Sequence, residues 1–154
     1  MNVPIDFDHI GFLTEDIDRD AAIFEQLFGS MTWSAKIADP LQGVVALFGR
    51  TRDGLVYELL QPLSEKSPIT RSLKTRTNVL NHLCFRCNDL ATEAMRLRAQ
   101  GFRPITEPTP AAAFAGNLIQ FFYHSNGMLL ELIEGTAGPF HTAPGAGDGG
   151  RPRA

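Results

Sequence analysis

The chain has 154 residues, of which 44% are hydrophobic and 20% are charged, a composition typical of one globular domain with a packed core. Its net charge of -3 and the lack of a block of basic residues argue against nucleic acid as a partner. Its apolar runs are far shorter than the ~20 residues of a membrane span, and no export segment stands at the N-terminus, so we expect a cytoplasmic protein without a membrane partner.

The first half of the chain predicts one strand, one helix and three further strands. The alternating segment 7–13 is typical of a strand, Asp16 stands where a helix N-cap belongs, and Gly29 stands where that helix would end. The apolar residues between them share one helix face: Ile17, Ala21, Phe24 and Phe28. The three strands are predicted near 31–37, 43–49 and 55–61. The turn Asp53-Gly54 joins the last two as a hairpin.

The second half predicts the same string of elements after a polar linker. The linker contains one short helix that is predicted to start at Ser67-Pro68. A strand then begins at Asn81, Asp89 caps a helix, and three strands follow with a hairpin turn at Asn126-Gly127. The last 17 residues include eight Gly or Pro and predict a flexible tail. The predicted organisation is one domain, 1–137, with modules at about 5–62 and 79–135 and a linker at 63–78, followed by the tail, 138–154.

An internal repeat relates the two halves. A shift of 73 positions aligns them without a gap and superposes at least nine identical residues, among them His9 on His82 and Glu58 on Glu131. Each half has the predicted element order βαβββ. We therefore predict an α+β fold in which two tandem βαβββ modules form one curved, partly barrel-like mixed sheet around a single metal cleft.

Four residues stand out because the repeat places them in equivalent positions: His9, Glu58, His82 and Glu131. A histidine on a strand is more often structural, and a glutamate on an amphipathic strand more often faces solvent. Each of these glutamates, however, has apolar neighbours on its own strand face, where a buried carboxylate needs a partner. Two imidazoles and two carboxylates suit one divalent ion of Ni, Co, Mn, Zn or Fe.

Other residues of types common in functional sites have simpler structural interpretations. Cys84 and Cys87 form a C-x-x-C pattern that is either a redox pair, half of a zinc site or two reduced cysteines. We favour reduced cysteines, because residues three apart on a strand point to opposite faces. His124 lies at a predicted strand end that faces either the cleft or solvent. The large aromatic residues either wall a pocket or pack in the core, and we favour the core: Trp33, Phe114, Phe121 and Phe122.

Four segments carry a family resemblance: DHIG at 8–11, ELLQPL at 58–63, NHL at 81–83 and LELI at 130–133. Over roughly residues 5–135 the chain resembles the vicinal oxygen chelate superfamily, which includes glyoxalase I, extradiol dioxygenases, bleomycin resistance proteins and methylmalonyl-CoA epimerase. It is most similar to the epimerase-like branch. The resemblance implies a homodimer and one divalent metal ion, with four ligands: His9, Glu58, His82 and Glu131.

The resemblance also implies a mechanism in which the metal chelates two substrate oxygens and stabilises an enolate as a Lewis acid. Glu131 would be the catalytic base, as a ligand that can loosen from the metal. Epimerases of this branch carry a glutamate where this chain has Leu41. Two-sided epimerisation needs two bases, and Asp39 stands two residues away, ~6–7 Å along an extended chain. The leucine at position 41 therefore argues against methylmalonyl-CoA epimerisation itself.

The sequence therefore predicts a metal-dependent isomerase, epimerase or lyase that acts on a small carbonyl or acyl-thioester substrate. The alternative is a metabolite- or antibiotic-binding protein of the resistance type without catalysis, which Leu41 favours and the four ligand-type residues disfavour. An extradiol dioxygenase fits less well, because Glu58 would occupy a position that iron–oxygen chemistry leaves open.

Overall fold

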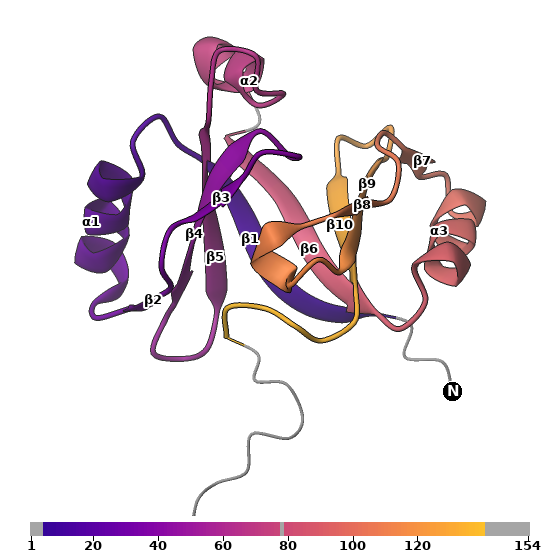
Figure 1. Cartoon of the computed structure of the whole chain (residues 1–154), viewed down its shortest axis with the longest axis horizontal. Helices are drawn as coiled ribbons and strands as arrows, with labels where there is room; N and C mark the ends of the chain where they lie inside the picture. The colour runs from indigo at the N-terminus through magenta and orange to yellow at the C-terminus, as the bar shows by residue number, and fades with distance from the viewer. Residues whose placement is uncertain (1–4, 78, 141–154) are drawn as a thin grey trace, which may run out of the picture.

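The computed structural model describes residues 5–77 and 79–140 (Figure 1). The first module consists of β1 (Asp6–Leu13), α1 (Ile17–Phe28), β2 (Thr32–Trp33), β3 (Ile37–Asp39), β4 (Val44–Arg50) and β5 (Val56–Pro62). Helix α2 (Thr70–Thr75) lies in the linker. The second module consists of β6 (Leu80–Cys87), α3 (Leu90–Ala99), β7 (Arg103–Pro104), β8 (Thr109–Pro110), the 3-10 turn η1 (Ala112–Phe114), β9 (Leu118–Tyr123) and β10 (Leu129–Glu134).

All strands belong to one open, mixed ten-stranded sheet with the order β2-β4-β5-β1-β6-β10-β9-β7, while β3 pairs with β4 and β8 with β9. The first strands of the two modules, β1 and β6, run antiparallel at its centre, and each has the last strand of its own module as a parallel neighbour. The two halves rise on either side of this central pair in Figure 1. The predicted α+β fold of two tandem modules in a curved mixed sheet is confirmed.

The two long helices begin at the predicted capping residues. Asp16 accepts a hydrogen bond from the backbone N–H of Arg19 at 3.0 Å, and Asp89 accepts one from that of Thr92 at 2.8 Å. Helix α1 ends at Gly29, whose φ of 77° is in the region that favours glycine. The short linker helix begins at Thr70, two residues after the predicted Ser67-Pro68 start.

The single strand predicted at 31–37 is wrong, because two short strands, β2 and β3, replace it. The break lies at Ser34, whose side-chain hydroxyl, instead of a backbone carbonyl, accepts the hydrogen bond from the N–H of Phe48 at 3.0 Å. A side chain that takes over a ladder contact interrupts regular pairing. The second module is divided in the same way into β7 and β8, and both of these strands end in a proline at the sheet's periphery.

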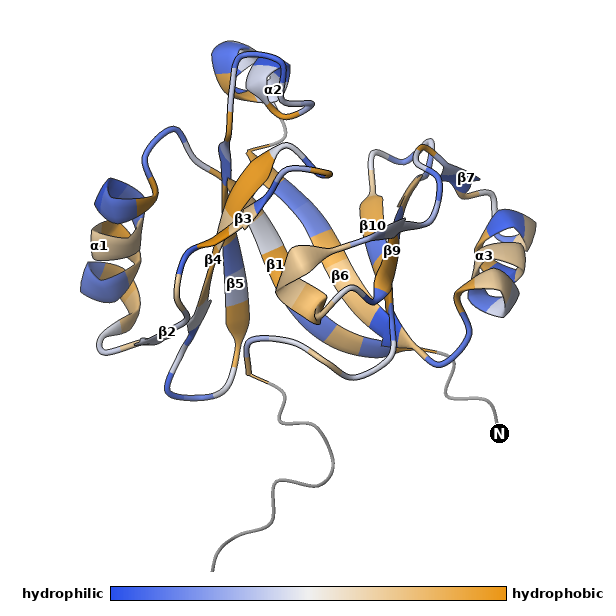
Figure 2. Cartoon of the chain, in the orientation of Figure 1, coloured by the Kyte–Doolittle hydropathy of each residue, from blue (hydrophilic) through white to orange (hydrophobic). Residues whose placement is uncertain are grey.

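Side chains of the sheet alternate between an outer face, which the helices cover, and an inner face. On the outer face, Leu59 of β5 packs under α1 and Leu132 of β10 packs under α3, and both are fully buried. On the inner face, Leu60 and Ile133 join a third core cluster that includes Phe114. Helices α1 and α2 carry much hydrophilic colour in Figure 2, whereas β3 and β10 are mainly hydrophobic. Helices α1 and α3 thus each cover the outer face of one half of the sheet and leave the inner face free for a site.

The predicted tail begins within the described residues, but 141–154 lie outside them. Phe140 packs partly buried against the inner core cluster, and the Arg50 guanidinium lies 4.9 Å from the centre of its ring. None of the described helices is long and apolar enough to cross a membrane. The boundary at residue 137 stays a prediction.

We expect the protein to form a homodimer in solution. The sheet ends at the short strands β2 and β7, and α1 leaves three large apolar side chains exposed: Ile23, Leu27 and Phe28. Apolar surface and open sheet edges of this kind favour self-association. Light scattering at micromolar concentration should give about twice the chain mass of 16.9 kDa. A monomer mass under these conditions would contradict the expectation.

Candidate metal centre

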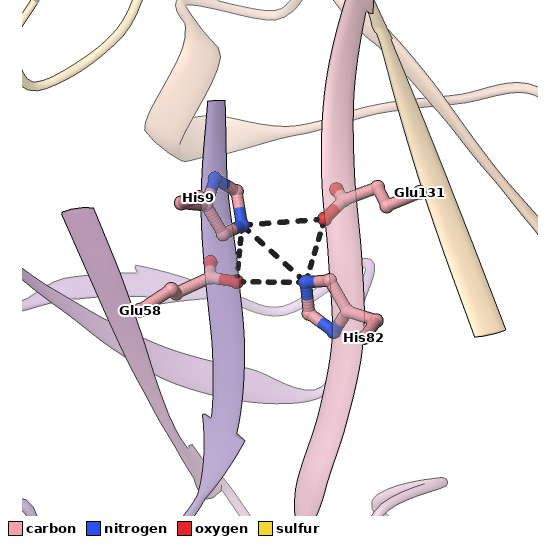
Figure 3. Close-up of side chains that lie close together, drawn as sticks. All are labelled: His9, Glu58, His82 and Glu131. Carbon is pink, nitrogen blue, oxygen red and sulfur yellow. Dashed lines mark hydrogen bonds and ion pairs between the residues drawn. The ribbon is translucent and has the colours of Figure 1, made fainter. Parts of the chain in front are cut away.

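The structure brings the four predicted residues together on the inner face of the sheet, where the two modules meet (Figure 3). Nε2 of His9 lies 3.0 Å from Oε2 of Glu58, and Nε2 of His82 lies 2.9 Å from Oε2 of Glu131. The two imidazole Nε2 atoms are 3.3 Å apart. All four candidate ligand atoms lie within 4.8 Å of one another, and all four residues are buried. The arrangement is compact enough for one ion to contact every member.

Strand pairing explains why these four residues meet. His9 on β1 is opposite Cys84 on β6, and His82 on β6 is opposite Gly11 on β1, so the two histidines lie diagonally across the central pair. Glu58 and Glu131 come from the parallel neighbours β5 and β10. Because each residue occupies an inward position of its strand, the repeat in the sequence becomes a two-fold arrangement of donors in space.

Gly11 makes room for His82. A Cβ atom at Gly11 would overlap the His82 imidazole ring, with three ring atoms inside contact distance. The equivalent position in the second module is Cys84, so the repeat does not require a glycine here. The sequence interpretation missed this residue, although the change from Cys to Gly at equivalent positions was a visible signal.

The outer nitrogen of each imidazole contacts a neighbouring side chain. Nδ1 of His9 lies 2.7 Å from Oδ1 of Asp8, and Nδ1 of His82 lies 2.9 Å from Oδ1 of Asn81. An oxygen acceptor fixes the proton on Nδ1 and leaves the Nε2 lone pair directed at the centre, as metal-binding histidines require. Asp8 is itself held by Arg86, whose Nε donates to Oδ2 at 2.5 Å. The sequence analysis assigned no role to Asp8, Asn81 or Arg86.

The imidazoles and carboxylates of the cluster shift one another's pKa values. Burial alone would raise the pKa of Glu131, but the imidazoles of His82 and His9 outweigh burial and lower the pKa to about 2. Burial lowers the pKa of His82, yet contacts with Glu131 and Glu58 raise it above its usual value. The contacts within the cluster thus favour proton uptake by the imidazoles over proton uptake by the carboxylates.

The residues fit a divalent ion. Oε2 of Glu58 lies 3.0 and 3.3 Å from the two imidazole Nε2 atoms, and Oε2 of Glu131 lies 3.6 and 2.9 Å from the same two atoms, those of His9 and His82. Two buried carboxylates this close together need a compensating positive charge. A divalent ion would replace the imidazole protons and give both carboxylates and both Nε2 lone pairs a common partner. Nitrogen and oxygen donors in this ratio suit Ni, Co, Mn, Zn or Fe.

A cavity of about 390 Å³ opens beside the cluster, and Glu58 and Glu131 form part of its wall. Of the aromatic residues named above, Phe114 and Phe121 line this cavity. Phe114 also stacks on the His9 ring, with 6.1 Å between ring centres. Trp33 and Phe122 pack in the outer clusters under α1 and α3, and Phe114 and Phe121 pack in or against the inner cluster, so core packing is correct for all four.

His124, Cys84 and Cys87 take no part in the cavity wall. The His124 ring packs against Phe102, 4.9 Å between centres, at the end of α3. Both cysteines are free and buried, and they belong to different core clusters on opposite faces of β6. The two thiols point to opposite faces and do not pair with each other, which agrees with the interpretation of two reduced cysteines.

Leu41 and Asp39 occupy very different surroundings. Leu41 is 71% exposed and does not line the cavity. Asp39 is buried in the cavity wall, where its two carboxylate oxygens accept backbone N–H groups of Gln42 at 3.1 Å and Ala112 at 2.8 Å. Because Ala112 belongs to η1 of the second module, Asp39 ties the two modules together across the cavity.

Fold and site together define a class of protein with two βαβββ modules around a cluster of potential metal ligands. The chain belongs to the Glyoxalase/Bleomycin resistance protein/Dioxygenase superfamily, whose family model matches residues 8–123. It is 28% identical over 129 residues to the uncharacterized protein YqjC of Bacillus subtilis, a match that covers 82% of this chain and 90% of that protein.

Two solved structures extend the comparison. The hypothetical protein BH1468 from Bacillus halodurans C-125 has a TM-score of 0.74 at 25% identity, covering 85% of this chain and 94% of that one. Methylmalonyl-CoA epimerase from Mycobacterium tuberculosis has a TM-score of 0.71 at 27% identity, covering 83% of this chain and 86% of that one. The predicted family and its similarity to epimerases are confirmed.

Replacing Gly11 with alanine should abolish metal binding at the cluster. The added methyl group displaces the His82 ring and with it one donor, so we expect metal affinity to fall at least a hundredfold, measured by calorimetric titration with Co²⁺. Gly49→Ala is the matched control, because Gly49 lies on β4 and its Cβ would overlap the ring of Trp33 on β2, in the outer cluster under α1. That variant should lose stability but keep its metal affinity. Equal affinities in both variants would contradict the role of Gly11.

Metal removal should lower the melting temperature. A ligand that binds only the folded state adds about 2.7 kcal/mol at a hundredfold excess over its Kd, which for a domain of this size is roughly 5–10 °C. We expect a chelator to produce a decrease of this size in a calorimetric scan, and Co, Ni or Mn to reverse it. A variant with both His9 and His82 changed to alanine should show no response to the metal. A wild-type protein that also showed none would contradict a metal centre here.

Proposed function

We propose that the protein is a metal-dependent isomerase, epimerase or lyase that acts on a small carbonyl or acyl-thioester compound, with one divalent ion held by His9, Glu58, His82 and Glu131. The observation that supports this proposal most strongly is the convergence of these four buried donors at the wall of a cavity large enough for a small substrate. The family of the chain and its epimerase neighbours agree with the proposal.

The protein's own residues can bind a carbonyl compound and move a proton at its carbon. When bound, the ion would supply Lewis-acid chemistry toward substrate oxygens. Glu131 is the proposed base, the role that the family resemblance implies for it, and it lines the cavity where a substrate would lie. Its carboxylate would accept a proton from carbon and return it. Phe114 and Phe121 would exclude water from this part of the cavity.

The surroundings of Leu41 and Asp39 favour chemistry with one base. Leu41 faces solvent and has no titratable group, and the two oxygens of Asp39 are occupied by backbone N–H donors. A single base accepts a proton and returns it on the same side of the substrate. This favours a proton shift between neighbouring atoms, or elimination, over inversion at one carbon by two opposed bases.

Replacing Glu131 with glutamine tests the assignment of the base. The amide oxygen can still bind a metal but accepts no proton, so hydrogen–deuterium exchange at the α-carbon should fall at least a hundredfold at saturating Co²⁺. Exchange would be followed by NMR on a panel of 2-acyl thioesters and hemithioacetals. Glu58→Gln makes the same chemical change at the equivalent carboxylate and should reduce exchange less than tenfold. Full exchange in the Glu131 variant would show that this residue is not the base.

The same panel separates catalysis from binding alone. A metabolite-binding protein without catalysis would bind members of the panel, as calorimetry would show, yet cause no exchange in any of them. Exchange by the metal-loaded protein that disappears with a chelator supports the enzyme. Binding without exchange across the whole panel would contradict it.

A further inference from the structure

We infer that the cavity beside the four donors takes a neutral substrate with an apolar body, one that carries no charged group beyond the oxygens that bind the metal. The inference rests on the proposed function and names the class of substrate for that site. It comes from three properties of the cavity: the character of its wall, the sign of its charges and the composition of its rim.

The wall of the cavity is apolar and comes from both modules. Strand β3 of the first module contributes Ile37, and β9 and β10 of the second contribute Ile119, Phe121 and Leu129. Strands β3 and β10 are mainly hydrophobic in Figure 2. A wall of this kind stabilises an apolar body by removing its surface from water, and this contribution grows with each buried methylene group.

The charges in the wall have one sign. Three carboxylates line the cavity, Asp39, Glu58 and Glu131, and no lysine or arginine does so within residues 5–77 and 79–140. A divalent ion would neutralise the two glutamates, which leaves Asp39 as the remaining charge. An anionic group on the substrate would thus lose water without gaining a positive partner and would be repelled by Asp39.

One polar group in the wall suits a neutral oxygen. Gln42 lines the cavity, and its Nε2 is buried and has no hydrogen-bond partner among the described residues. An amide N–H without an acceptor favours a carbonyl or hydroxyl oxygen, since burying it unpaired costs free energy. Together with the substrate oxygens that bind the metal, this amide donor would orient the substrate without requiring a charged group on it.

The rim of the cavity is apolar as well. Leu80, Ile105 and Tyr123 line it and are 67%, 57% and 44% exposed. Exposed apolar side chains that continue a buried apolar wall mark a surface for an apolar ligand. A substrate with an apolar chain longer than the enclosed space could therefore extend over these three residues.

Three hydroxamates with the same metal-binding head test the inference on Co²⁺-loaded protein by calorimetric titration. Acetohydroxamate has a short tail, hexanohydroxamate an apolar tail, and 5-carboxypentanohydroxamate the same tail with a carboxylate in place of its last methyl group. We expect hexanohydroxamate to bind at least tenfold more tightly than each of the other two. A carboxylate probe that binds as tightly as hexanohydroxamate would overturn the inference.

A charge at the rim provides a matched control. Ile105→Lys places a cation beside the cavity and should improve binding of the carboxylate probe relative to hexanohydroxamate at least fivefold. Met95→Lys adds the same charge at an exposed position on α3 that does not line the cavity, and should leave that ratio unchanged. Equal ratios in the two variants would overturn the inference.

Metal content measured on the same samples separates the two levels of the proposal. A protein that takes up no Co²⁺ would overturn the proposed function and the inference with it. A protein that takes up Co²⁺ and binds all three hydroxamates equally would overturn the substrate class and leave the proposed metal centre in place.

Discussion

The structure depends on the burial of two carboxylates and two imidazoles at the seam between its modules. His9, Glu58, His82 and Glu131 are all at most 5% exposed, a position that ionised groups tolerate only with partners of opposite charge. Each partner comes from a different strand, so the pairing of β1, β5, β6 and β10 and the satisfaction of these charges require one another. A shift of one residue in any of these strands would turn its donor to the helix-covered face.

The two halves share a fold but surround their histidines differently. His9 has a carboxylate, Asp8, on its outer nitrogen and the thiol of Cys84 opposite, whereas His82 has the amide of Asn81 and the bare backbone of Gly11. A carboxylate makes an imidazole more basic than an amide does. The repeat therefore sets the positions of the donors, and these differences between equivalent residues make the two nitrogen ligands chemically unequal.

Sequence periodicity and the internal repeat predicted those features that depend on near neighbours in the chain or on equivalent positions in the two halves. The helix caps at Asp16 and Asp89 were predicted because capping depends on one residue and its near neighbours, and the four donors because the repeat aligned them. The division of the strand at Ser34 was not predicted, because it depends on a hydroxyl meeting a distant backbone N–H. The Asp8–Arg86 contact joins residues 78 positions apart, and no local pattern marks it.

Asp39 links the fold to the chemistry that the site can perform. Its carboxylate accepts backbone N–H groups from both modules, so the same contacts that close the cavity wall also hold this group in place. A carboxylate used as a clamp cannot rotate toward a substrate carbon without breaking those hydrogen bonds, each of which contributes about 1 kcal/mol or more. Leu41, where related epimerases carry their glutamate, faces solvent. Under the proposed function, proton transfer therefore falls to Glu131, because neither Asp39 nor the residue at position 41 offers a free carboxylate to the cavity.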